Sequence, residues 1–282
     1  MPSARCSMLE RAPSQDKPQD EGPRRPVAFR GAGFMPGGGR TSGWIALVLV
    51  IALWQLAGSA GWVNPLFLPA PSAIAVAIYK LAMSGALWQH LSASILRIGV
   101  GWVLGTAAGV AVGFAIGLSR LARSVGITFI SALFPIPKIA LLPLLILWLG
   151  IGEEPKIATI ALGVFFSTAI SVYSGVDAVP RNLIRMAQSF NVPFHAIVRR
   201  VVWPGALPSI LAGFRITAAV ALLLVVSAEM IGAQFGIGAF VLQAGNLMQT
   251  DQLLAGVVIL SLFGLVVGKA INVLEARLLH WR

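Results

Sequence analysis

Charged residues are scarce in this 282-residue sequence. Only 11% of the residues are Asp, Glu, Lys or Arg, whereas 57% are hydrophobic and the mean hydropathy is +0.85. An average soluble domain has about 25% charged residues. The composition therefore argues against an ordinary soluble fold and indicates a polytopic membrane protein.

Cysteine is almost absent as well. The single thiol, Cys6, excludes an intrachain disulfide and a cysteine metal cluster. His195 has no second His, Asp or Glu at ligand spacing, so it gives no metal site. The phosphate-binding pattern G-x-x-x-x-G-K-[ST] is also missing, because Gly268-Lys269 is followed by Ala270. We therefore expect no metal, no cofactor and no catalytic residue in this chain.

Long apolar segments are abundant. A bilayer core about 30 Å thick needs roughly 20 apolar residues per helix. Six segments reach that scale with few interior charges, namely 44–60, 92–117, 125–149, 156–175, 208–231 and 253–276. The run 73–83 is shorter and contains Lys80, which favours a helix at the outer interface, with a seventh crossing as the alternative. The fold class is therefore all-α, with about six transmembrane helices.

Lys and Arg are distributed unevenly between the expected loops. With the N-terminus inside, most of them precede Thr41, lie in the loop at about 176–207, or lie close to the inner ends of the other spans, whereas only Lys80 and Lys156 lie outside. Basic residues near span ends tend to stay in the cytoplasm. We therefore expect both termini to be cytoplasmic. This topology also explains the net charge of +11 without a nucleic-acid partner.

The chain divides by composition into two parts. Residues 1–43 are rich in Pro, Gly and Arg and lack a periodic apolar face. This composition predicts a disordered basic cytoplasmic tail. Residues 44–282 are expected to form one transmembrane domain.

The loop at about 176–207 contains signals for two short helices. Pro180 suits the first turn of a helix expected at 181–189, Asn191 tolerates the left-handed backbone that ends a helix, and Pro193 begins a second helix. Arg199 and Arg200 are expected to be exposed beside its apolar face. Such a unit is suited to dock into a groove on a soluble partner. The alternative is a loop that holds acidic lipid at the membrane surface.

Glycine recurs at every fourth position along the second expected span. The members of this stripe are Gly101, Gly105, Gly109, Gly113 and Gly117. Small residues at this spacing let another backbone approach closely. Packing inside one subunit is favoured over a contact between subunits.

Prolines interrupt the third expected span at Pro135, Pro137 and Pro143. Irregular backbone at membrane depth is tolerated mainly where it is buried or lines a cavity, so this span is a candidate pathway helix. Lys138 lies near its middle and is the preferred residue for attracting an anionic substrate. The translocation pathway candidates are Pro137, Lys138, Pro143, Ser227 and Glu229.

Three other charges fall in or near the spans, each with a structural alternative. Arg97 and Arg215 are close enough to span ends to extend toward the interface. Glu229, near the outer end of the fifth span, is expected to act as a gate or in a structural ion pair.

The loop is similar to a known cytoplasmic motif that reads roughly E-A-A, three residues, G, then nine residues to I-x-L-P. Ala187 matches the second alanine, while Arg185, Met186 and Asn191 depart from the acidic residue, the first alanine and the glycine. The end of the motif is matched by residues 203–208 and 212–215. Further similar segments are residues 68–72, 94–97, 137–144, 148–152, 228–230 and 278–281. Together, over about residues 44–282, the sequence resembles the permease subunits of binding-protein-dependent ABC importers, in the nitrate, sulfonate and taurine branch.

The resemblance implies a type I importer permease in the bacterial inner membrane. Such a subunit forms the pathway for a small solute, here an organic sulfonate, taurine, nitrate or a similar anion, delivered by a periplasmic binding protein. It implies a permease homodimer and two cytoplasmic ATP-binding subunits, which bind and hydrolyse the ATP. The residues expected to couple to those subunits are Arg185, Met186, Ala187, Ser189, Phe190, Asn191, Val192, Pro193, Phe194, Arg199 and Arg200.

Two other classes of function remain open at this point. A secondary transporter would use acids deep in the spans and inverted repeats, and neither is evident here. A receptor or scaffold would explain the docking loop. It would not explain prolines and a lysine at membrane depth.

Overall fold

The structure is a computed structural model that describes residues 40–278. Residues 1–39 of the predicted tail, with Cys6, lie outside the described part of the chain. The described residues are helical and include no strand. The helices are α1 (Arg40–Ser59), α2 (Pro71–Met83), α3 (Ala86–Leu118), α4 (Arg120–Leu133), η1 (Lys138–Leu141), α5 (Leu142–Leu149), α6 (Glu154–Asp177), α7 (Arg181–Ser189), α8 (Phe194–Ile197), η2 (Val198–Val202), α9 (Trp203–Gly232), α10 (Ile237–Asn246) and α11 (Thr250–Leu278).

Four helical segments among the described residues are long and apolar enough to cross a membrane. They are Ala86–Leu118, Glu154–Asp177, Phe194–Gly232 and Thr250–Arg277. Each contains one of the spans expected from the sequence. The third of them joins α8, η2 and α9 into a single helical segment. The expected first and interfacial helices correspond to the shorter apolar helices Gly43–Ser59 and Pro71–Met83.

The expected span at 125–149 is not one continuous helix. α4 ends at Leu133, and the chain bends by 85° before the helical segment Lys138–Leu149. Pro135 and Pro137 lie in this break. Proline lacks the amide that an α-helix needs, and its ring clashes with the preceding turn. The prediction of a single crossing at this place is therefore corrected to a broken span or a re-entrant pair of helices.

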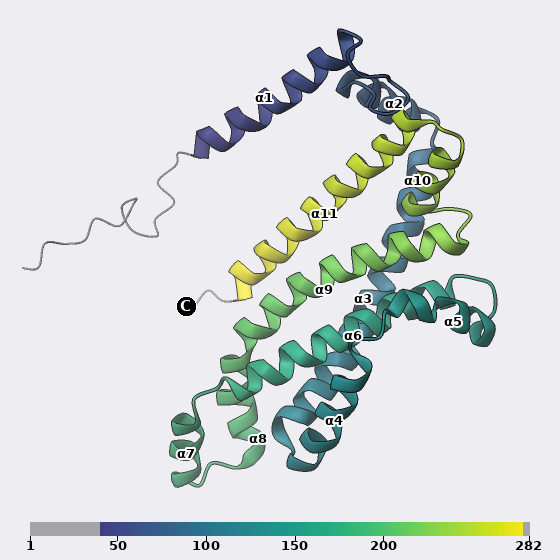
Figure 1. Ribbon diagram of the computed structural model, residues 1–282. Helices are drawn as coiled ribbons and strands as arrows, with labels where there is room; N and C mark the ends of the chain where they lie inside the picture. The colour runs from purple at the N-terminus through teal and green to yellow at the C-terminus, as the bar shows by residue number, and fades with distance from the viewer. Residues whose placement is uncertain (1–39, 279–282) are drawn as a thin grey trace, which may run out of the picture. The chain divides into compact units, whose positions relative to one another are not determined.

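The core of residues 51–282 is built on α3, α6 and α9. α6 packs against both of the others, and Figure 1 shows it lying alongside α9. Apolar residues of α6 at this contact, among them Ile160, Val164, Ala169 and Val172, are fully buried. Short helices extend the core at both ends, with α7 and α8 near the end of α6 and α10 between α9 and α11.

The glycine stripe of α3 lies along its contact with α6. A Cβ atom added at Gly109 would meet the Cβ of Thr168 at 2.6 Å and the carbonyl oxygen of Phe165 at 2.8 Å. A Cβ at Gly113 would meet the Cβ of Val172 at 2.6 Å. Real side chains do not approach this closely, so the two backbones can pack at this distance only with glycine on α3. The stripe therefore lies in a contact inside one subunit.

We expect Gly109→Ala to destabilise the protein by about 1–3 kcal/mol, because the added methyl group overpacks the contact with α6. Gly99→Ala on the same helix is the matched control, since a Cβ there meets no atom within 4 Å. It should be neutral or stabilising by up to about 1 kcal/mol. Thermal unfolding of the two purified variants in the same detergent measures the difference. Equal stability of the two variants would contradict the close packing.

Candidate functional site

The loop expected to dock a partner folds as two short helices. α7 spans Arg181–Ser189, which confirms the predicted helix at 181–189, and Asn191 has a φ of 54° in the left-handed region. The Val192 amide donates to the Ala187 carbonyl oxygen at 3.1 Å, closing the turn after α7. Asn is one of the few residues that adopts this conformation at low cost. The turn thus keeps its geometry without glycine.

The apolar side of the loop packs on the ends of α6 and α9. Ile197 and Val202 are buried in one cluster with Val172, Val176 and Val179. The partly buried residues Ile184, Ala187 and Val192 pack against this cluster. Ala187 and Val192 therefore fix the loop to its own chain.

The opposite side of the loop is open. Phe190 and Phe194 are 76% and 67% exposed, and Met186 is 55% exposed. Six other expected coupling residues are also exposed, namely Arg185, Ser189, Asn191, Pro193, Arg199 and Arg200. Large apolar side chains beside arginines are typical of the centre of a protein interface. Nine of the eleven expected coupling residues are thus accessible.

Arg199 and Arg200 belong to a π-helical turn, η2, which the sequence analysis did not predict. α9 begins directly after it with Trp203-Pro204. Pro204 has no amide to donate to the carbonyl of Arg200, four residues earlier. This missing donor is the sequence signal for irregular winding. π-turns are frequent at functional sites.

Lys138 is the first residue of η1, directly after the break that follows α4, and its ammonium group bonds to backbone carbonyls. Nζ donates to the carbonyl oxygens of Leu133, Phe134 and Ile136 at 3.0, 2.7 and 2.6 Å. These carbonyls lie in and just after the last turn of α4, where helical partners are missing. An ammonium group has three donors, and all three have acceptors here. In this geometry Lys138 has a structural role. To bind Lys138 as well, an anionic substrate would have to share the same N–H donors.

The two prolines expected in the pathway lie at helix starts. Pro137 is the residue before η1, and Pro143 is in the first turn of α5. Both positions suit proline because its fixed φ fits a helix start. Ser227 lies on α9, and its Oγ donates to the Leu223 carbonyl at 3.0 Å.

Glu229 and Arg97 form a buried ion pair at the opposite end of the core from the loop. Glu229 is 1% exposed and Arg97 is 2% exposed. Arg97 Nη1 donates to Glu229 Oε1 at 2.6 Å and to the Phe235 carbonyl at 2.7 Å. Ser94 Oγ and the Gly238 amide donate to the two carboxylate oxygens at 2.8 and 2.9 Å. These contacts join α3, α9 and the start of α10.

The expectation that Arg97 extends toward the interface is wrong, because the side chain points inward to Glu229. The physical reason is that two opposite charges in one core stabilise each other when their hydrogen bonds are complete. The sequence does contain a hint, since a basic and an acidic residue occur near the same ends of two spans. The sequence alone does not show that these two residues pair, because they lie 132 positions apart.

Arg97 also reaches the link between α5 and α6. Its Nη2 donates to Glu153 Oε1 at 2.9 Å, and its Nε donates to the other oxygen. These hydrogen bonds to Arg97 hold the pKa of Glu153 below its usual value. Lys156 is also buried and donates to the Gly152 carbonyl at 2.8 Å. Since the Glu153 side chain is 48% exposed, it connects the buried ion pair to the surface.

Sequence comparison assigns the family. Residues 105–280 match the profile of the family described as binding-protein-dependent transport system inner membrane component. The chain belongs to this family. A binding-protein-dependent permease is a transport subunit and not itself catalytic, and it is a multi-pass membrane protein.

Curated relatives of this permease cover most of its length. The putative aliphatic sulfonates transport permease proteins of Bacillus subtilis (strain 168) and Escherichia coli (strain K12) are 34% and 36% identical, over 87% and 86% of this chain and 90% and 92% of the relatives. The taurine transport system permease protein of Escherichia coli (strain K12) is 35% identical over 83% of this chain and 87% of the relative.

A solved structure has the same fold. The MetNI methionine ABC transporter in an inward-facing conformation matches with a TM-score of 0.62 and 21% sequence identity. The match covers 70% of this permease and 98% of the compared chain. The predicted all-α fold of a type I importer permease is therefore confirmed.

We expect Arg97→Met to destabilise the permease by about 3–5 kcal/mol, because it leaves the Glu229 carboxylate buried without its partner. Adding Glu229→Gln to this variant should recover a large part of the loss. Arg215→Met is the matched control, since Arg215 forms a partly exposed ion pair with Glu275 and should cost less than about 1 kcal/mol. Thermal unfolding of the three variants provides the measurement. A double variant as unstable as Arg97→Met would show that the ion pair is not the cause.

Proposed function

We propose that this permease forms the translocation pathway of an ATP-driven importer for an organic sulfonate. The main support for this proposal is that three relatives, 34–36% identical over 83–87% of this chain, are named for aliphatic sulfonates or taurine. Family membership favours an importer over a secondary transporter or a scaffold. Nitrate and similar small anions remain the other members of the predicted substrate class.

The proposal includes a periplasmic binding protein that delivers the solute and two ATP-binding subunits that hydrolyse ATP. It also includes a permease homodimer, because the pathway of such a transporter lies between two permease subunits. The exposed aromatic and basic surface of the loop supports docking of an ATP-binding subunit. We place this loop and both termini in the cytoplasm of the bacterial inner membrane, in accordance with the distribution of arginine.

We keep Pro137, Lys138, Pro143, Ser227 and Glu229 as the residues proposed to line the pathway. The contacts that support this role differ from one residue to the next. The chain bends at Pro137 and Lys138. This irregular backbone supports a cavity here that is lined by backbone groups and not by apolar side chains. The ion pair between Glu229 and Arg97 supports a contact that holds three helices together at the proposed outer end. An anion passing Lys138 would share N–H donors that already bond to backbone carbonyls.

The substrate class is tested by ATP hydrolysis of the complex in lipid nanodiscs, formed from the permease, its ATP-binding subunit and its binding protein. Binding protein loaded with taurine or an alkanesulfonate should stimulate hydrolysis about tenfold over unloaded protein. Nitrate is the comparison anion. Stimulation by nitrate alone would move the substrate class away from sulfonates, and failure of any ATP-binding subunit to associate would contradict the importer.

The coupling role of the loop is tested at Asn191. Val at this left-handed position is strained by about 1–2 kcal/mol, whereas Gly is not. We expect Asn191→Val to reduce uptake at least severalfold while the protein remains inserted, and Asn191→Gly to transport normally. A charge reversal at both Arg199 and Arg200 should also uncouple transport. Normal uptake by Asn191→Val and by the Arg199→Glu/Arg200→Glu variant would refute the docking role.

A further inference from the structure

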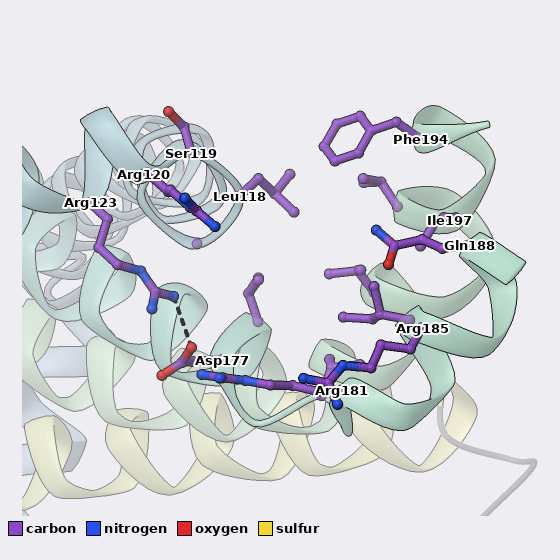
Figure 2. Close-up of a pocket in the computed structure, with 16 residues that line it drawn as sticks. Leu118, Ser119, Arg120, Arg123, Asp177, Arg181, Arg185, Gln188, Phe194 and Ile197 are labelled. Atoms are coloured by element: carbon purple, nitrogen blue, oxygen red, sulfur yellow. Dashed lines mark hydrogen bonds and ion pairs between the residues drawn. The ribbon is translucent and has the colours of Figure 1, made fainter. Parts of the chain in front are cut away.

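A pocket of about 400 Å³ lies where the loop meets the ends of α3, α4 and α6 (Figure 2). Its polar lining contains four arginines and one acid. Arg120 and Arg123 come from α4, and Arg181 and Arg185 come from α7. Asp177, the last residue of α6, is the acid.

The pocket has an excess of positive charge. Asp177 forms an ion pair with Arg123 at 2.8 Å, shown by the dashed line in Figure 2. Within residues 40–278, no carboxylate forms an ion pair with Arg120, Arg181 or Arg185. Three uncompensated guanidinium groups around one small space repel one another and favour an anion there.

Two helices begin at the pocket with arginine where an acid is the usual choice. α4 starts at Arg120 and α7 starts at Arg181, and neither has an acidic residue in its first turn. A helix N-terminus carries partial positive charge, so arginine there is unfavourable in isolation. An anion bound between the two starts would interact favourably with both helix ends and both side chains.

The pocket lies at the level of the membrane surface. α3 and α6 are both long and apolar enough to cross a membrane, and they end at Leu118 and Asp177 in the pocket lining. The ends of membrane helices lie in the headgroup region. An anion fixed to the bilayer is therefore already present at this depth and at high local concentration.

α4, which carries two of the pocket arginines, also has an exposed apolar face. Leu121, Val125 and Phe129 are 78%, 51% and 62% exposed, and they recur at every fourth position on one face. Leu118, Ile184 and Phe194 add apolar side chains to the pocket itself. A ligand suited to both surfaces has an anionic head and hydrocarbon chains.

We propose that this pocket binds the phosphate headgroup of an anionic phospholipid. Arg120 and Arg181 contact the phosphate, since guanidinium groups bind phosphate oxygens in a bidentate manner. The acyl chains follow the exposed apolar face of α4. A bound lipid would thus connect α4 with α7, one of the two helices of the docking loop.

The experiment titrates phosphatidylglycerol into the purified full-length permease in detergent, and native mass spectrometry counts the bound lipids. Arg120→Gln/Arg181→Gln removes two pocket arginines and should weaken binding about tenfold. Arg199→Gln/Arg200→Gln is the matched control, because it removes the same number of positive charges from η2, outside the pocket lining. This control should bind like the wild type, and phosphatidylcholine should bind all three proteins weakly. Arg120→Gln alone is the second variant if the double variant does not purify as a folded protein.

Three outcomes would overturn the proposal. Equal weakening in the pocket variant and the control would indicate unspecific attraction to basic residues. Binding of glycerol 3-phosphate as tight as that of phosphatidylglycerol would assign the pocket to a free phosphate compound. Unchanged lipid binding together with loss of association with the ATP-binding subunit would assign the pocket to a protein partner.

Discussion

The close approach of α3 to α6 is the constraint on which the rest of the structure depends. Glycines on α3 let its backbone touch the side chains of α6 along five successive turns. The same two helices carry Arg97 and Lys156 near one end and Leu118 and Asp177 at the other. The bonds of Arg97 to Glu153 at the start of α6 and the basic pocket therefore both depend on this contact between the two helices.

The two ends of this core use charge differently. At the end of the core away from the loop, Arg97 and Glu229 are buried, and each has several hydrogen-bond partners. At the other end, Arg120, Arg181 and Arg185 share a pocket with one acid, which already pairs with Arg123. A completed network fixes helices in place, whereas an incomplete one attracts a ligand or partner.

Much of the architecture could be predicted from the sequence because it rests on local signals. The lengths of the apolar segments indicate the membrane spans, and the spacing of the glycines indicates the close packing of α3. Pro180, Asn191 and Pro193 indicate the loop with its two helices. Contacts between distant residues could not be predicted. The pair of Arg97 with Glu229 needs α3 and α9 to be placed side by side, and the three carbonyls that bind Lys138 appear only once the chain bends after Leu133. The positive charge of Lys138 does not show by itself whether the residue binds a solute or hydrogen-bonds to carbonyls at the end of α4.

The continuous segment Phe194–Gly232 has a mechanical consequence. It has 39 residues, and at 1.5 Å per residue such a helix is about 60 Å long. One of its ends, at Phe194, belongs to the loop, and the other carries Glu229. If a partner docked on the loop tilted this segment at Phe194, the Glu229 carboxylate at the far end would move relative to Arg97 without any relay of side chains between them. The π-turn at Val198–Val202 and Pro208 interrupt the regular α-helical hydrogen bonding of this segment, so they are the points where it would bend and reduce the tilt that reaches the far end.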